Sequence, residues 1–118
     1  MKGKSLFARM GFAVNGWKEA FFTESSFRTQ LVAGAAALLA TTALQPRPVW
    51  WALIFLIILL ILAGELFNTA LERVLDGLHP GQADFVRAAK DCAAGAVLLL
   101  SMAAVLIFGL AVVDTLAS

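Results

Sequence analysis

Charged residues, cysteine, histidine and tyrosine are rare or missing in this chain of 118 residues. Only 14% of the residues are charged and 61% are hydrophobic, whereas a soluble domain is about 25% charged and about 45 to 50% apolar. The single cysteine, Cys92, excludes an intramolecular disulfide and a cysteine-cluster metal site. The composition therefore excludes an ordinary soluble domain and predicts a membrane protein.

The nucleotide-binding and zinc motifs of soluble enzymes are missing as well. The sequence has no GxGxxG loop and no His-Glu zinc motif. Gly3-Lys4-Ser5 is similar to the end of a phosphate-binding loop, but no glycine or strand precedes it to build that loop. Any nucleotide site must therefore be built from the faces of helices, and we expect no nucleic-acid partner.

Three apolar segments predict three transmembrane helices. The whole chain is expected to form a single membrane domain, residues 1–118, with spans at residues 29–46, 49–77 (including a cytoplasmic extension) and 84–115. Pro46 and Pro48 do not continue a helix comfortably, so they mark a tight outer turn between the first two spans. Gly34, Gly64 and Gly95 indicate places where helices approach one another closely. The predicted fold class is an all-α membrane protein.

The segment before the first span predicts an amphipathic helix over residues 5–26. Its apolar side chains recur at helical spacing at Leu6, Met10, Ala13, Val14, Trp17 and Phe21. Arg9, Asn15 and Lys18 interrupt any continuous apolar stretch, so we expect no cleaved signal peptide. Such a helix is expected to lie on the membrane surface.

The basic residues predict the orientation in the membrane, because lysine and arginine accumulate on the cytoplasmic side. Arg47 alone falls on one side of the predicted spans, and the others fall on the opposite side: Lys2, Lys4, Arg9, Lys18, Arg28, Arg73, Arg87 and Lys90. The N-terminus and the loop between the second and third spans should therefore be cytoplasmic, and the C-terminus should be outside.

The second span carries polar residues on one face of its cytoplasmic half. Glu65, Asn68, Glu72 and Asp76 follow at spacings of three, four and four residues, which places them in one stripe of a helix. An unpaired acid at the bilayer centre costs about 2.5 to 3.5 kcal/mol on insertion scales, so such a stripe normally marks a functional site. Glu65 lies about 24 Å along the helix from Val49, just inside the cytoplasmic boundary.

Further acids and a lysine are predicted at the same boundary, namely Glu24, Lys90 and Asp91. Magnesium prefers oxygen ligands and is usually held by one or two carboxylates together with substrate phosphates, while a lysine neutralises phosphoryl charge. A carboxylate at a desolvated boundary can serve as general base toward a hydroxyl. Glu65 is the deepest acid and is best placed for the hydroxyl of a lipid.

Two motifs resemble the signature of the prokaryotic diacylglycerol kinase family: Glu65-x-x-Asn68-Thr69-Ala70-x-Glu72-x-x-x-Asp76 and Ala89-Lys90-Asp91-x-Ala-Ala-Gly-Ala-Val. The resemblance extends to Gly16-Trp17-Lys18 and to Glu24-x-x-Phe27-Arg28. That family consists of small integral membrane lipid kinases, generally homotrimers, which transfer the γ-phosphoryl group of ATP to diacylglycerol or, in a sister branch, to undecaprenol. It implies a homotrimer in the bacterial cytoplasmic (inner) membrane that uses Mg²⁺ with ATP and shares its sites between subunits.

The resemblance also implies a role for each matching residue. Glu65 matches the general base, and Asn68 matches the residue that orients the reacting groups. Glu24 and Glu72 match carboxylates linked to the metal. The nucleotide and phosphate region comprises Lys90, Asp76, Asp91 and Glu72, and the lipid-substrate region comprises Glu65, Trp17, Arg28 and Gln30.

The chain departs from the family pattern at several positions. Phe12 and Ala13 stand where relatives often have hydroxyl-bearing residues, and Ala94 replaces a common serine. Gln30 occupies a place often held by an acid, and Ala83 a loop place where a histidine can occur. These departures affect the expected adenine and lipid head-group contacts and leave the metal and phosphate residues intact.

The sequence leaves several readings open. The Glu24-Ser-Ser-Phe-Arg28 stretch favours diacylglycerol as acceptor, with undecaprenol as the alternative. A more distant alternative is a small proton-coupled transporter, although its carboxylate would be expected near the middle of the membrane. Asp76 and Asp91 can instead be structural ion-pair partners, and Arg28 can simply extend to lipid phosphates.

Overall fold

The computed structural model describes residues 3–118, and this part of the chain folds into four α-helices. They are α1 (Leu6–Thr23), α2 (Ser25–Leu44), α3 (Pro48–Leu78) and α4 (Asp84–Ala117). Among the described residues, α2, α3 and α4 are long and apolar enough to cross a membrane, which fits a multi-pass membrane protein. Lys2, one of the residues used to predict the orientation, lies outside the described residues.

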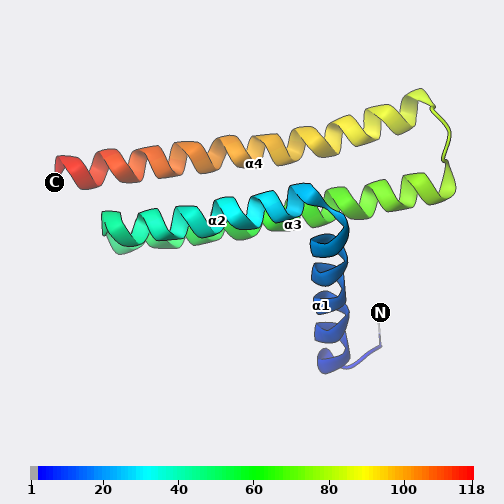
Figure 1. Ribbon diagram of the computed structural model, residues 1–118, viewed down its shortest axis with the longest axis horizontal. Coiled ribbons are helices and arrows are strands. Elements are labelled where there is room, and N and C mark those ends of the chain that lie inside the picture. Colours follow the sequence, from blue (N-terminus) through cyan, green and yellow to red (C-terminus); the bar gives the residue numbers. More distant parts are fainter. Residues whose placement is uncertain (1–2) are drawn as a thin grey trace.

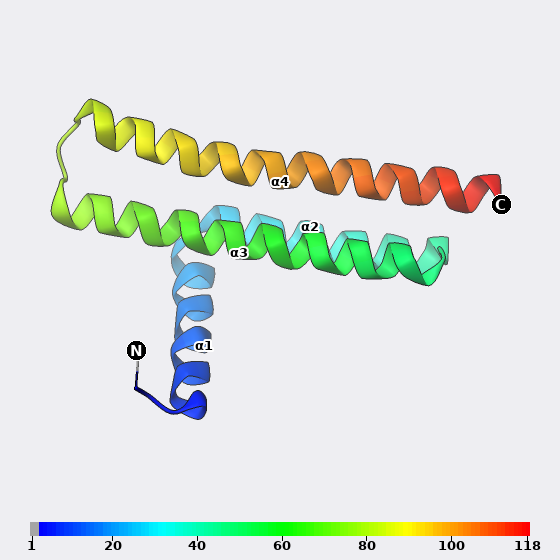
Figure 2. The ribbon, with the colours of Figure 1, turned by 180° about the vertical axis from the view of Figure 1, so that it is seen from behind.

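The central helix of the molecule is α3, which contacts each of the other three. Figures 1 and 2 show α2 and α4 running alongside α3, while α1 crosses their direction and projects from the bundle on the side away from α4. The turn between α2 and α3 lies at the same end as the C-terminus of α4. The connection between α3 and α4 lies at the opposite end, beyond the start of α2. The last turn of α3 therefore lies beside the start of α4.

The turn between α2 and α3 follows from its two prolines. Gln45 adopts the left-handed conformation with φ of 54°, and its N–H donates to the carbonyl of Thr41 at 2.9 Å. Pro48 is the first residue of α3, where the missing N–H removes no intrahelical hydrogen bond. Arg47, between the prolines, accordingly stands outside both helices.

The structure corrects the predicted boundary between the first two helices. The surface helix was expected to extend over residues 5–26 and the first span over 29–46, but α1 ends at Thr23 and α2 begins at Ser25. Glu24 is extended, with φ of −118° and ψ of 109°, and this single residue turns the chain from one helix into the next. No glycine or proline marks the break, so residues 25–28 were not expected in the first turn of α2. The predicted ends of α3 and α4 differ from the observed ones by two residues or fewer.

Two glycines let the spans approach closely. A Cβ atom at Gly34 would lie 3.0 Å from Cγ2 of Ile58, and one at Gly64 would lie 2.8 Å from Cδ1 of Leu100. Gly34 thus brings α2 onto α3, and Gly64 brings α4 onto α3. The same expectation was wrong for Gly95, because a Cβ there meets nothing within 4 Å in the described chain.

At the end opposite the polar stripe, one carboxylate ties α4 to the start of α3. Asp114 accepts a hydrogen bond from Nε of Arg47 at 2.9 Å and another from Nε1 of Trp50 at 2.8 Å. These contacts join residues more than 60 positions apart in the sequence. They fix the position of the C-terminal turns of α4 relative to the α2–α3 turn.

Candidate active site

Glu65 lies on the face of α3 that is turned toward α2, and it is only 5% exposed. The hydroxyl of Ser26 donates to Oε2 of Glu65 at 2.6 Å, and Nε2 of Gln30 donates to Oε1 at 3.4 Å. Ser26 and Gln30 are one turn apart on α2, so both reach the same carboxylate. A buried carboxylate is costly unless it is hydrogen-bonded. These two donors from α2 therefore stabilise Glu65 at its depth.

One turn further along α3, Asn68 and Glu72 form a second polar pair. Nδ2 of Asn68 donates to Oε1 of Glu72 at 3.0 Å. The side-chain oxygen of Asn68 is buried and has no hydrogen-bond partner among residues 3–118. Since buried polar atoms are normally satisfied, this amide oxygen is available for a ligand.

Arg73 connects the same region of α3 to the α1–α2 junction. Its guanidinium donates to Glu19 and, at 2.6 Å, to the hydroxyl of Thr23, and it lies 3.6 Å from Oε1 of Glu24. Glu24 was predicted to be a metal-linked carboxylate. In this structure its carboxylate forms an ion pair with Arg73, at the residue where the chain turns between helices, and the metal-linked role stays a prediction.

A polar cavity of about 250 Å³ lies where the ends of α3 and α4 meet. Nζ of Lys90 contacts Oδ1 of Asp76 at 2.8 Å across the two helices, and Arg87 contacts Asp91 at 3.0 Å within α4. All four side chains line the cavity, together with residues 80–83 of the loop. Ala83 contributes no side-chain donor there, as its departure from the family pattern implied.

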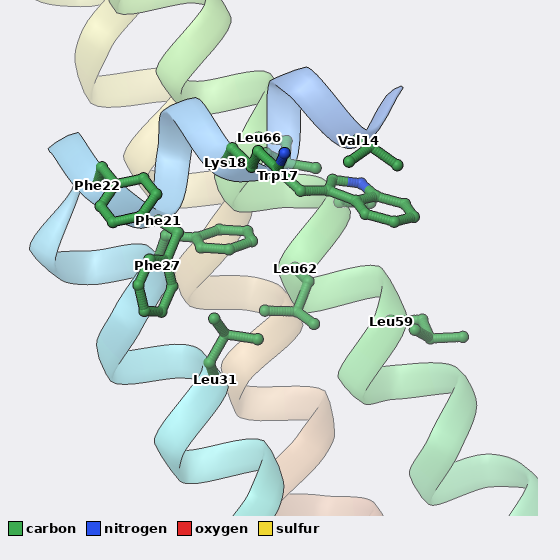
Figure 3. Close-up of a pocket in the computed structure, with 11 residues that line it drawn as sticks. Val14, Trp17, Lys18, Phe21, Phe22, Phe27, Leu31, Leu59, Leu62 and Leu66 are labelled. Atoms are coloured by element: carbon green, nitrogen blue, oxygen red, sulfur yellow. The ribbon is translucent and has the colours of Figure 1, made fainter. Parts of the chain in front are cut away.

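An apolar cavity of about 590 Å³ lies where α1 crosses the bundle. Figure 3 shows its walls, which come from three helices: Val14, Trp17, Lys18, Phe21 and Phe22 of α1, Phe27 and Leu31 of α2, and Leu59, Leu62, Ala63 and Leu66 of α3. Trp17, which was predicted to belong to the lipid-substrate region, lines this apolar cavity. Arg28 does not line this cavity, because its guanidinium donates to the carbonyl of Phe21 at 2.6 Å.

The described residues contain no group of three or more His, Cys, Asp or Glu side chains that could hold a metal ion by themselves. The oxygens of Asn68 and Glu72 nevertheless suit magnesium, which is usually bound by few protein oxygens together with substrate phosphates. The unpartnered oxygen of Asn68 beside the Glu72 carboxylate supports that fit.

The predicted site residues thus fall into separate groups along α3. Glu65 with Gln30 and Asn68 with Glu72 lie in consecutive turns, and Asp76 with Lys90 lies beyond them. Asp91 pairs with Arg87 within α4 and shares the polar cavity with Asp76. Sequence reasoning missed Ser26, which contacts Glu65 directly. Its spacing of four residues from Gln30 was the one available signal.

Comparisons with known proteins cover most of the chain. The family model described as prokaryotic diacylglycerol kinase matches residues 11–112. A diacylglycerol kinase of Synechocystis sp. is 39% identical over 107 residues, which are 89% of this chain and 61% of the relative. A diacylglycerol kinase of Sinorhizobium sp. is 31% identical over 100 residues, 85% of this chain and 72% of the relative.

A third relative carries a different name. The undecaprenol kinase of Bacillus subtilis is 34% identical over 80 residues, 68% of this chain and 65% of the relative. The matched part of this chain spans about three fifths of the length of the Synechocystis protein described above. With a family model that extends from the middle of α1 almost to the end of α4, the chain belongs to the prokaryotic diacylglycerol kinase family.

Proposed function

We propose that this protein is a membrane lipid kinase that transfers the γ-phosphoryl group of MgATP to the hydroxyl of diacylglycerol, giving phosphatidic acid. The observation that carries the proposal is the environment of Glu65. This carboxylate is buried, accepts hydrogen bonds from the neutral donors Ser26 and Gln30, and lies beyond an apolar cavity along α3. A base for a lipid hydroxyl needs such a position, within reach of both an acyl-chain environment and a polar boundary.

The proposed reaction divides between the groups of the stripe. Glu65 accepts the proton of the lipid hydroxyl as the hydroxyl oxygen attacks the γ-phosphorus and ADP leaves. Asn68 orients the reacting groups, and Lys90 contacts phosphoryl oxygens. Magnesium bound through Asn68 and Glu72 would neutralise charge on the phosphates.

The nucleotide is proposed to occupy the polar cavity lined by Asp76, Lys90 and Asp91. Lys90 is held at that cavity by Asp76, so an arriving phosphate would exchange one anionic partner of the lysine for another. We propose a homotrimer in the cytoplasmic membrane of a bacterium, with the N-terminus inside and the C-terminus outside. In a trimer, polar groups that a single chain leaves open can be completed by a neighbouring subunit.

The lipid is proposed to approach through the apolar cavity beneath α1. Phe27, Leu62 and Leu66 provide walls suited to acyl chains, and Trp17 lies on the α1 side (Figure 3). Lys18 adds a cationic group to the same lining. Gln30, also predicted to belong to the lipid-substrate region, donates a hydrogen bond to Glu65. It would therefore place the lipid region next to the proposed base.

Undecaprenol is the second candidate acceptor. Its support is the Bacillus subtilis relative, which is named undecaprenol kinase and aligns with 68% of this chain. Both candidate acceptors present a hydroxyl at the end of an apolar body. The contacts around Glu65 would serve either.

The deciding experiment measures phosphoryl transfer from MgATP to diacylglycerol and to undecaprenol, side by side in mixed micelles with purified protein. We expect faster transfer to diacylglycerol, abolished by Glu65→Gln with nucleotide affinity largely retained. Glu72→Gln should instead weaken binding of magnesium-nucleotide. Transfer to neither lipid would refute the proposed function, and wild-type turnover of Glu65→Gln would refute the role of the base.

A further inference from the structure

Ser26 is the residue with the shortest contact to Glu65, and neither the family motifs nor the comparisons assign it a role. Its hydroxyl donates to Oε2 at 2.6 Å, which is a short O–H···O hydrogen bond. Ser26 itself is exposed, whereas Glu65 is 5% exposed. The serine therefore stands at the open side of a buried acid.

The side chains that donate to Glu65 within residues 3–118 are neutral, namely Ser26 and Gln30. No lysine or arginine forms an ion pair with Glu65 within the described part of the chain, where each salt bridge involves other acids. An ionised carboxylate offers about four lone-pair positions. Ser26 and Gln30 take one on each oxygen, which leaves further positions free for an incoming hydroxyl.

The backbone around Ser26 makes it suited to hold a side chain in place. Glu24 is extended, Ser25 is the first residue of α2, and Ser26 is the second. Gln30 follows one turn later on the same face. A glutamate that is held at both oxygens loses most of its side-chain freedom, so its orientation is set before a substrate arrives.

We propose that Ser26 is a positioning residue for Glu65: its hydroxyl, with the amide of Gln30 on the second oxygen, fixes the carboxylate in the orientation that receives the acceptor hydroxyl. This inference rests on the proposed function, in which Glu65 is the base. It concerns a residue outside the polar stripe of α3, contributed by the first turn of α2. The site would thus depend on where α1 ends.

A purely structural role for Ser26 predicts a different outcome. If the hydrogen bond served only to join α2 to α3, its loss would lower stability and leave the turnover of folded protein unchanged. If it positions the base, its loss lowers kcat while the KM for ATP stays the same. Ser25, the preceding residue, gives a matched control because it is exposed and shares no hydrogen bond with Glu65.

The experiment compares Ser26→Ala, Ser26→Thr and Ser25→Ala with the wild type in mixed micelles. A hydrogen bond to a charged group predicts that kcat of Ser26→Ala falls about tenfold or more. The KM for ATP should stay within twofold, about the change expected of the Ser25→Ala control. Ser26→Thr should recover most of the loss, because threonine retains the hydroxyl. A kcat for Ser26→Ala equal to that of Ser25→Ala would overturn the proposal.

A second measurement keeps this test separate from the proposed function. An accessible carboxyl oxygen attacks the central carbon of a hydrophobic carbodiimide, whose nitrogen takes up the proton, to give an O-acylisourea. Mass spectrometry then gives the rate of modification at Glu65 without any turnover. We expect faster modification in Ser26→Ala than in Ser25→Ala, and a rate near wild type in Ser26→Thr. Equal rates in both alanine variants would overturn the positioning of the carboxylate. A wild type that phosphorylates neither lipid would refute the proposed function alone.

Discussion

Gly34→Ala tests how closely α2 must approach α3 for the candidate site to form. Gly34 is buried, and a methyl group at this position would lie 3.0 Å from Cγ2 of Ile58. Favourable carbon contacts lie at about 3.5 to 4.0 Å, so the two helices would have to separate by about 0.5 to 1 Å. Ile58 is β-branched and has one strongly preferred rotamer in a helix, so it cannot easily turn aside.

The magnitude follows from two opposing effects. Overpacking of this kind typically costs about 1 to 3 kcal/mol. Replacing glycine by alanine within a helix raises the unfolding free energy by about 0.8 to 1.0 kcal/mol. The net loss of unfolding free energy for Gly34→Ala should therefore be about 0 to 2 kcal/mol. The separation should also break the bond from Gln30 to Glu65, which at 3.4 Å is already long.

The assay is unfolding in mixed micelles of a mild detergent and sodium dodecyl sulfate, followed by far-ultraviolet circular dichroism. Gly95→Ala is the matched control, because its new methyl group meets nothing within 4 Å and keeps the helix-propensity gain. We expect Gly34→Ala to be less stable than Gly95→Ala by about 1 to 3 kcal/mol. Equal unfolding free energies of the two variants would show that Ile58 moves aside without loss of stability and would refute the reasoning.

Three further predictions concern other contacts of the molecule. Asp114→Ala should lower the thermal midpoint in detergent and shift the fluorescence of Trp50, whose N–H loses its acceptor; an unchanged spectrum would contradict that contact. Lys90→Met should raise the KM for ATP about 10- to 100-fold in steady-state kinetics, because it removes a charged hydrogen-bond donor from the proposed phosphate site. Trp17→Ala should raise the KM for diacylglycerol about tenfold, the effect of losing about 1.5 kcal/mol of apolar contact, and a selective rise in the KM for ATP would contradict the proposed lipid path.

Much of the fold could be predicted from the apolar segments and from the prolines that interrupt them. Uninterrupted apolar segments identified three long helices, and Pro46 and Pro48 marked the turn between the first two spans. The junction at Glu24 could not be predicted in the same way. A single extended residue without glycine or proline leaves no local signal, because the change of direction depends on how α1 packs across α2 and α3.

The candidate site was predictable where its members share a helix. Asn68 and Glu72 are four residues apart, which places them on one face of a helix, and in α3 they form a hydrogen bond. Contacts between helices were harder to predict, because the sequence alone does not define which helix faces pack against each other. The partners of Glu24 and Glu65, Arg73 and Ser26, come from helices whose relative rotation only the structure defines.

The depth of Glu65 is set by the start of α2 as much as by its own position in α3. Along the stripe, exposure increases from Glu65 at 5% to the exposed side chain of Asp76, at 60%. These residues are about 16 Å apart along one helix. Ser26 covers Glu65 from the first turn of α2, whereas Asp76 faces α4 and the open polar cavity. If α1 continued through Glu24, as its helical pattern predicted, α2 would begin later and the carboxylate would lose its covering serine. The single extended residue therefore determines where along α3 the buried part of the site ends and the polar cavity begins.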